Sequence, residues 1–452
     1  MSSRSRRFTD HGRPPKRASV RGHSFHVESL GCAKNQVDSE RMIAELEHAG
    51  WRRSESPESA DVLIVNTCGF ISSAKKESIE TSLELKQRHP DKKVIMVGCL
   101  TERYGDTLAA ELPEIDGFLG NRDPSAILGI VEEGRGGRRA ASSSSFERTH
   151  LLSYPGSAYL KVAEGCDNRC TYCAIPLIRG GLASRDPSEI EQEARQLLDR
   201  GIRELVLIAQ DLGSYGRDID GYSDGLPGLL DRLSGLAGDF WVRLLYIHPD
   251  HFPAGILDIM ERDARFLRYF DIPFQHASPT VLRAMGRIGD PQGNTELVAR
   301  IRRRLPGAVI RSTFLLGFPG ETDDDFQRLT RFQDEVRPDW LGCFTWSREE
   351  DTPAYSLPGR VPARTARARR AVIEERQVPI TAAALDALVG RELDVLIEER
   401  VEGEALSLGR AYLHAPEVDG LVVVRGTPAA GTRCRVLIEK RNGVDLEGSI
   451  RG

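Results

Sequence analysis

The chain has 452 residues, of which 40% are hydrophobic and 29% charged, a balance typical of a globular protein with a large buried core. Its formal net charge of −5 argues against a general polyanion binder. No apolar run reaches the roughly 18–20 residues that a membrane span needs. The N-terminus also lacks an apolar signal region, so we expect a cytoplasmic protein without membrane contact.

The first 23 residues are predicted to form a disordered basic tail, because they carry many lysines and arginines against a single acid, Asp10. Residues 24–133 alternate short apolar runs with helical patterns, which is the βα rhythm of a Rossmann-like parallel sheet. Strands are expected at residues 25–30, 62–65 and 94–97, and helices at residues 39–49 and 74–88.

A Gly-, Arg- and Ser-rich stretch at residues 134–150 predicts a linker. Residues 151–385 repeat the strand–helix rhythm six times, which suits an open, partial (β/α)6 barrel. Its strands are expected at residues 159–163, 204–209, 241–246, 268–272, 309–316 and 340–345. Residues 386–452 have short β-rich runs at 393–397, 421–424, 434–438 and 444–446, which predict a small antiparallel all-β barrel.

Three cysteines, Cys166, Cys170 and Cys173, lie close together in a CxxxCxxC pattern. Iron–sulfur clusters are normally held by four thiolates, so three leave one iron open to bind a small molecule. A zinc site usually has paired CxxC units or a histidine at matching distance, and neither is present. The spacing therefore favours a four-iron cluster, with structural zinc as the alternative.

The CxxxCxxC pattern, with Tyr172 before the last cysteine, resembles the signature of radical S-adenosylmethionine (SAM) enzymes. The resemblance implies that Cys166, Cys170 and Cys173 hold a 4Fe–4S cluster. It also implies that the open iron binds SAM and that Tyr172 contacts this cofactor. Residues 151–385 would then form a radical SAM partial barrel.

A second set of cysteines, Cys32, Cys68 and Cys99, follows the three predicted N-terminal strands one by one. The carboxyl ends of parallel strands share one edge of a sheet, so these thiols are expected to converge in space. The adjoining glycines at positions 31, 69 and 98 allow close backbone approach. A metal site and inert packing of buried cysteines are both compatible with this pattern.

Segments 28–40 (ESLGCAKNQVDSE), 66–70 (NTCGF) and 98–100 (GCL) resemble the N-terminal domain of methylthiotransferases, and the resemblance extends over residues 24–450. It implies that Cys32, Cys68 and Cys99 hold an auxiliary 4Fe–4S cluster. It also implies that SAM serves both as methyl donor and as radical source, with an electron donor such as flavodoxin or ferredoxin. Cys343 and Cys434 match no ligand motif and are expected to be packing residues.

Further candidate cofactor-binding residues lie at predicted strand ends, where active-site groups of β/α barrels gather. Gly317 and Gly320 belong to a segment that resembles the SAM-binding strand end, with an ordinary βα turn as the alternative. Arg179 follows the cluster loop and is expected to pair with an anionic group, the alternative being a surface arginine. The remaining candidates are Gln210, Asp211, Asp271, Gln275 and His276.

The family has two main substrates, a modified adenosine in tRNA and an aspartate in small-subunit ribosomal protein twelve. Residues 386–452 resemble a TRAM domain, usually an RNA-binding module. However, residues 391–451 hold 9 basic and 11 acidic side chains, which suits a basic protein partner better than RNA. An acidic face is expected at Glu392, Asp394, Glu398, Glu399, Glu402 and Glu404.

Segments 174–180 (AIPLIRG) and 209–211 (AQD) resemble the ribosomal-protein branch. The prediction is therefore a monomeric enzyme that methylthiolates the β-carbon of an aspartate in ribosomal protein twelve. A tRNA adenosine methylthiotransferase is the alternative. A non-catalytic iron–sulfur carrier or RNA-binding scaffold is the more distant one.

Overall fold

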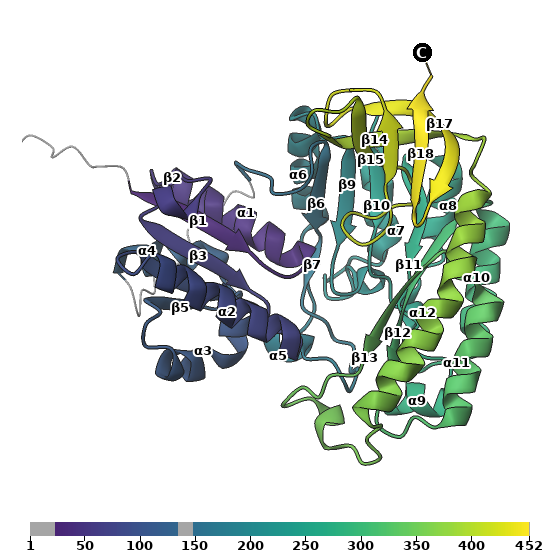
Figure 1. Ribbon diagram of the computed structural model, residues 1–452, viewed down its shortest axis with the longest axis horizontal. Coiled ribbons are helices and arrows are strands. Elements are labelled where there is room, and N and C mark those ends of the chain that lie inside the picture. Colours follow the sequence, from purple (N-terminus) through teal and green to yellow (C-terminus); the bar gives the residue numbers. More distant parts are fainter. Residues whose placement is uncertain (1–22, 134–147, 452) are drawn as a thin grey trace, which may run out of the picture.

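The computed structural model describes residues 23–133 and 148–451 (Figure 1). The predicted basic tail and most of the predicted linker lie outside these residues, so both stay predictions. No helix in the two described ranges is long and apolar enough to cross a bilayer. Figure 1 shows the N-terminal sheet (purple) beside the larger central sheet, with the C-terminal strands (yellow) against one end of the latter.

The N-terminal sheet has five parallel strands in the order β2-β1-β3-β4-β5. Helices cover both of its faces, so its central strand is buried along its whole length. The strands are β1 (Ser24–Ser29), β2 (Arg52–Arg53), β3 (Val62–Thr67), β4 (Lys93–Gly98) and β5 (Gly117–Leu119). The helices are α1 (Ala33–His48), α2 (Ser72–Arg88), α3 (Cys99–Glu111) and α4 (Ile127–Glu133), with 3-10 turns η1 (Pro57–Ser59) and η2 (Pro124–Ala126).

Helix α1 begins at Ala33, six residues before the predicted start at residue 39. Its first turns carry Lys34, Asn35 and Asp38, which interrupt the apolar periodicity that the prediction used. All three are nevertheless buried, because this end of α1 faces the central sheet. The polar end of α1 is therefore part of an interface rather than a loop.

The central sheet has six parallel strands in the order β13-β12-β11-β10-β9-β6, which confirms the predicted parallel sheet. Its strands are β6 (Ser157–Lys161), β9 (Glu204–Ile208), β10 (Trp241–Leu244), β11 (Phe266–Asp271), β12 (Val309–Leu316) and β13 (Trp340–Thr345). Its helices are α5 (Ile175–Arg179), α6 (Pro187–Asp199), α7 (Gly225–Ser234), α8 (Ile256–Arg262), α9 (Pro279–Ala284), α10 (Pro291–Arg304), α11 (Asp323–Val336) and α12 (Ala363–Asp386). A short antiparallel pair, β7 (Ala163–Glu164) and β8 (Ala183–Ser184), brackets the loop with the CxxxCxxC pattern. Single 3-10 turns are η3 (Leu212–Ser214), η4 (Pro249–His251) and η5 (Pro353–Ser356).

The C-terminal strands form a closed five-stranded barrel in the order β14-β15-β16-β18-β17. The bounds are β14 (Glu392–Arg400), β15 (Leu406–Arg410), β16 (Val422–Arg425), β17 (Arg433–Asn442) and β18 (Asp445–Ile450). The prediction of a wholly antiparallel barrel is wrong in one pairing, since β16 and β18 run parallel. Five strands cannot alternate direction all the way round a closed barrel, so two neighbours must share a direction.

The barrel also closes one end of the open central sheet. Tyr269 and Trp340 of the central sheet lie in one hydrophobic cluster with Leu413 and Val395 of the barrel. Beside them Glu204 is fully buried and paired with two arginines, one from each unit, Arg243 at 2.7 Å and Arg410 at 2.6 Å. The C-terminal barrel is therefore fixed to the central sheet by both apolar packing and a buried ionic triad.

Candidate active site: two cysteine triplets around one cavity

All six predicted cluster cysteines line a single cavity of about 610 Å³ between the N-terminal and central sheets. The first triplet is Cys166, Cys170 and Cys173, and the second is Cys32, Cys68 and Cys99. None of the six is in a disulfide. The cavity therefore brings together two groups of thiols that are far apart in the sequence.

The loop with the first triplet leaves β7 and is held by backbone hydrogen bonds. The Cys166 amide donates to the Gly180 carbonyl at 3.1 Å, and the Cys173 amide donates to the Cys170 carbonyl at 3.1 Å. Gly165 has a φ of +66°, and a Cβ there would lie 1.9 Å from the Gly181 carbonyl oxygen. Only glycine fits this turn, which starts the loop on its path to the cavity.

Tyr172 lies within the first loop, lines the cavity and packs edge-on against Phe318, with ring centroids 6.4 Å apart. Burial raises the pKa of this phenol, and the charge of the neighbouring Arg287 opposes that rise. Arg287 also donates to the Pro273 carbonyl at 2.7 Å. The predicted aromatic cofactor contact is therefore a rigid wall of the cavity.

The second triplet occupies the carboxyl edge of the N-terminal sheet, as the strand pattern predicts. A Cβ on Gly31 would lie 3.0 Å from Cys68 Cβ, and one on Gly69 would lie 2.7 Å from the Cys99 carbonyl oxygen. The glycines thus let the three loops touch. Cys32 directly precedes α1 and Cys99 is the first residue of α3, so both sulfurs lie at helix N-termini, which favour negative charge.

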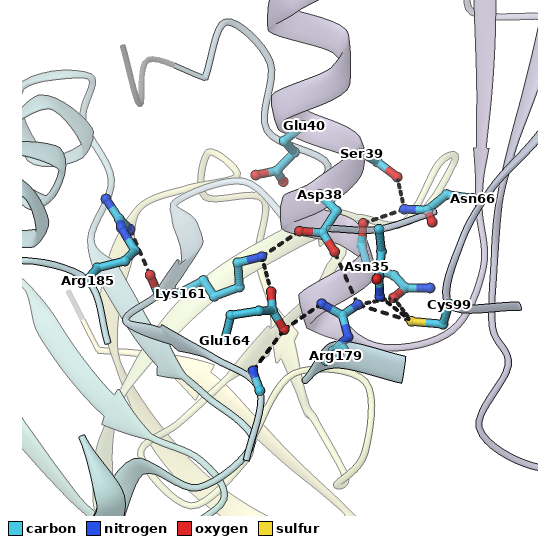
Figure 2. Close-up of polar contacts among 12 residues, drawn as sticks. Asn35, Asp38, Ser39, Glu40, Asn66, Cys99, Lys161, Glu164, Arg179 and Arg185 are labelled. Atoms are coloured by element: carbon cyan, nitrogen blue, oxygen red, sulfur yellow. Dashed lines mark hydrogen bonds and ion pairs between the residues drawn. The ribbon is translucent and has the colours of Figure 1, made fainter. Parts of the chain in front are cut away.

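Cys99 is the most enclosed of the six cysteines and has three polar neighbours. Arg179 donates to its Sγ at 3.2 Å, and the Sγ itself lies 3.2 Å from the side-chain oxygen of Asn35 (Figure 2). Asn121 also donates to this Sγ, at 3.3 Å. Burial nevertheless raises the pKa of the Cys99 thiol to about 12. A metal must therefore displace the proton when it binds this sulfur, and the two donors stabilise the resulting thiolate.

Burial also raises the pKa of three other cysteines of the two triplets. Burial raises the pKa of Cys166 to about 11 and that of Cys173 to about 12, and it also raises the pKa of Cys68. Without metal these groups are thiols at neutral pH. Loading of the site therefore releases protons and depends on pH.

Arg179 joins the two halves of the site, as Figure 2 shows. From the end of α5 it pairs with Asp38 of α1 at 3.1 Å and with Glu164 of β7 at 2.8 Å. Lys161 of β6 also bonds both carboxylates, at 2.5 and 2.7 Å. Sequence analysis predicts that Arg179 pairs with an anionic group, and the structure supplies two such groups from different units.

Asn35 was missed by the sequence analysis, although it lies in the segment 28–40. Its amide nitrogen donates to the carbonyls of Leu30 and Thr67, each at 3.0 Å, and so ties the ends of β1 and β3 together. Its amide oxygen accepts from Arg179 at 2.6 Å. The only sequence signal was its position three residues after Cys32.

Lys34, Tyr246 and Arg287 were also missed, and all three line the cavity. Lys34 Nζ lies 3.4 Å from the centroid of the Tyr246 ring, and burial lowers the pKa of this amine to about 8. Tyr246 has a φ of +68°, an unusual backbone conformation for a non-glycine residue. Nothing in the local sequence pattern marks these positions, because they meet only through tertiary packing.

The other predicted site residues divide into cavity residues and supporting residues. Gln210 and Gln275 line the cavity. Asp211 lies behind it and accepts from Asn168 of the first loop at 3.0 Å. Asp271 pairs with Arg311 at 3.1 Å, and His276 is fully buried beside Glu321.

Gly317 and Gly320 do not line this cavity or the one next to it. The Gly317 amide donates to the Glu321 carboxylate at 2.6 Å, so this backbone donor is already engaged. Their predicted contact with SAM stays a prediction.

A second cavity of about 690 Å³ adjoins the first and shares Tyr172, Gln275 and Phe344 with it. Its wall includes Phe70 and Trp346, and Phe344 is 51% exposed. Exposed aromatic side chains at a cavity mouth are typical of binding surfaces.

The cysteines fit iron–sulfur clusters better than single metal ions. Each triplet offers three free thiols to a roomy cavity, and thiolate is the normal ligand of such clusters. The zinc alternative has less support, since zinc takes four ligands and neither triplet has a histidine or a second CxxC pair at matching distance.

The acidic face expected on the C-terminal barrel is largely neutralised by the barrel's own arginines. Glu398 pairs with Arg410 at 2.5 Å, and Arg435 of β17 pairs with Glu392 at 3.4 Å and with Asp394 at 3.2 Å. These partners come from neighbouring strands, which a count of charges along the sequence does not reveal. Three of the six acids expected on this face are therefore paired with arginines, and the role of the face in binding a partner stays a prediction.

Three family models match the chain in order. The uncharacterized protein family UPF0004 matches residues 24–120, the radical SAM superfamily matches residues 160–332, and the TRAM domain matches residues 389–450. The radical SAM match implies a 4Fe–4S cluster and SAM as cofactors.

Proteins of known name are similar over most of the chain. A ribosomal protein uS12 methylthiotransferase RimO from Treponema denticola is 44% identical over 461 residues, covering 92% of this chain and 98% of the relative. Its namesake from Syntrophomonas wolfei is 44% identical over 407 residues, covering 88% and 92%. The solved structure of the radical SAM methyltransferase TsrM from Kitasatospora setae has a TM-score of 0.57 at 15% identity, covers 74% of this chain and 75% of its own, and shares the fold. The chain therefore belongs to the radical SAM methylthiotransferases of the RimO family.

Proposed function

We propose that this protein transfers a methylthio group to the β-carbon of an aspartate in small-subunit ribosomal protein uS12. The observation that carries the proposal is the placement of two cysteine triplets around one cavity. Two relatives at 44% identity are named ribosomal protein uS12 methylthiotransferase. Radical chemistry suits this carbon because its C–H bond is not acidic enough for proton abstraction.

We assign the SAM-binding cluster to Cys166, Cys170 and Cys173. When bound, this cluster supplies the single electron that cleaves SAM. Tyr172, Gln210 and Gln275 line the same cavity and are the side chains proposed to contact SAM.

We assign a second, auxiliary 4Fe–4S cluster to Cys32, Cys68 and Cys99. Support comes from the three loops that touch at the carboxyl edge of the N-terminal sheet and from the two donors on Cys99 Sγ. Clusters held by both triplets would face the same cavity, which suits a reaction that needs a radical source and a sulfur carrier at one substrate carbon. The electron donor, expected to be a flavodoxin or a ferredoxin, and the monomeric state stay predictions.

The test is a reaction under anaerobic conditions with protein reconstituted with iron and sulfide. Reductant, SAM and purified uS12 are added, and the protein substrate is analysed by mass spectrometry. We expect one methylthio group on an aspartate of uS12, and none with the Cys166/Cys170/Cys173→Ala variant. Modification of tRNA with unmodified uS12 would assign the enzyme to the tRNA branch instead. SAM cleavage without either product would overturn both substrates.

A further inference from the structure

Lys34 is a buried cation whose partner is missing from the described chain. The residue is 5% exposed and lines the cavity on the side of the neighbouring Cys32. Its Nζ lies over the Tyr246 ring at 3.4 Å. Within the two described ranges this ammonium forms no ion pair and donates no hydrogen bond to an oxygen, and the charged groups that act on it through space are Cys32, Arg179, Asp271 and Glu164.

The other two cations of the cavity wall are engaged by the protein itself. Arg179 is held by Asp38 and Glu164 (Figure 2). Arg287 donates to the Pro273 carbonyl at 2.7 Å, and its charged neighbours include Cys170 of the first triplet and Asp250. Among the described residues, Lys34 is thus the lysine or arginine of the wall that has neither a carboxylate in ion-pair contact nor a hydrogen-bond acceptor.

A buried ammonium without an anion is costly, so its retention in a cavity points to a ligand that supplies the anion. The Tyr246 ring stabilises the cation from one side only, since a cation–π contact uses the ring face and leaves the N–H donors free. A carboxylate suits these donors, because charge-assisted hydrogen bonds are strongest between ammonium and carboxylate.

We infer that Lys34 binds the side-chain carboxylate of the substrate aspartate and so makes the enzyme specific for aspartate over asparagine. The inference rests on the proposed function. The β-carbon of aspartate is bonded directly to the carboxyl carbon, so fixing the carboxylate also fixes the reacting carbon. Lys34 is then a positioning and specificity residue on the wall between the two triplets.

A double-mutant cycle tests this contact by equilibrium binding. The reconstituted enzyme, or its Lys34→Met variant, is titrated with fluorescently labelled uS12 that carries either aspartate or asparagine at the modified position. Loss of one partner of a desolvated charge pair is expected to weaken wild-type binding by about 30-fold when asparagine replaces aspartate. The Lys34→Met enzyme is expected to bind both forms with the same weakened affinity.

Two further variants control the result. Lys34→Arg keeps the charge and is expected to retain the preference for aspartate. Lys76→Met makes the same chemical change on an exposed part of α2 and is expected to bind like wild type. Lys34→Met should also melt no lower than wild type, since Lys34 forms no ion pair or hydrogen bond within the described residues.

Each outcome of the cycle is decisive. An unchanged preference for aspartate in the Lys34→Met enzyme would overturn the inference, as would loss of that preference in Lys34→Arg. Wild-type enzyme that neither binds nor modifies uS12 would overturn the proposed function and the inference with it. That failure is recognised because it occurs without any mutation.

Discussion

Replacement of Arg179 tests how the two halves of the site are held together. Its guanidinium donates at 2.8 Å to Glu164 and at 3.1 Å to Asp38, and its side chain is 1% exposed. Removing one partner of a buried ion pair costs about 3–5 kcal/mol. Lys161 still bonds both carboxylates. We therefore expect Arg179→Met to lower the free energy of unfolding by about 3 kcal/mol, the lower end of that range.

The same substitution removes a donor from Cys99 Sγ at 3.2 Å. Hydrogen bonds to ligand sulfurs raise the reduction potential of a cluster, because they stabilise the more negative, reduced state. A differential stabilisation of about 1 kcal/mol corresponds to about 40 mV for one electron. The auxiliary cluster of Arg179→Met is therefore expected to have a potential lower by about that amount.

Urea unfolding measures the first effect and a redox titration followed by electron paramagnetic resonance measures the second. Arg195→Met is the matched control, since Arg195 is 61% exposed and pairs only within α6. We expect a change below about 0.5 kcal/mol and no shift in potential for this control. An Arg179→Met protein as stable as the control, with an unshifted potential, would refute the role assigned to Arg179.

Three other predictions follow from single contacts. Glu204 is buried, and its two arginine partners hold the pKa of its carboxyl at about 2, against an ordinary 4.5. Ionised Glu204 therefore contributes about 3 kcal/mol to the free energy of unfolding above pH 4.5, and this contribution is lost as the pH falls toward 2. Denaturation at pH 7 and at pH 3 should show that the difference in free energy of unfolding between wild type and Glu204→Gln shrinks by about half. Gly165→Ala places a Cβ 1.9 Å from the Gly181 carbonyl oxygen, and iron analysis should show a loss of about four irons per chain. Phe344→Ala removes an aromatic side chain that is 51% exposed, so the melting temperature should equal that of wild type. The KM for uS12 should rise by a larger factor than kcat falls.

Much of the fold could be predicted from the sequence because parallel sheets carry strong apolar runs. The strands predicted at residues 309–316 and 340–345 coincide with β12 and β13. The meeting of Cys32, Cys68 and Cys99 was also predictable, since the carboxyl ends of parallel strands share an edge. Strand β15 was missed because its short Leu406–Arg410 segment mixes apolar and polar residues.

The parts that could not be predicted depend on contacts between units distant in sequence. Asp38 and Arg179 lie 141 residues apart and meet only after the N-terminal sheet docks on the central sheet. In the sequence Lys34 is an ordinary helix lysine, and only the structure shows its contact with the Tyr246 ring. The acidic run around Glu398 seemed free because its partner Arg410 belongs to the next strand.

The most direct test of the account counts iron in three reconstituted proteins: wild type, Cys32/Cys68/Cys99→Ala and Cys166/Cys170/Cys173→Ala. Two four-iron clusters give about eight irons per chain in wild type and about four in each variant. Each variant should keep the spectrum of the cluster that it can still hold. A wild-type count of about four, unchanged in the Cys32/Cys68/Cys99→Ala variant, would contradict the claim that both triplets hold a cluster at this cavity.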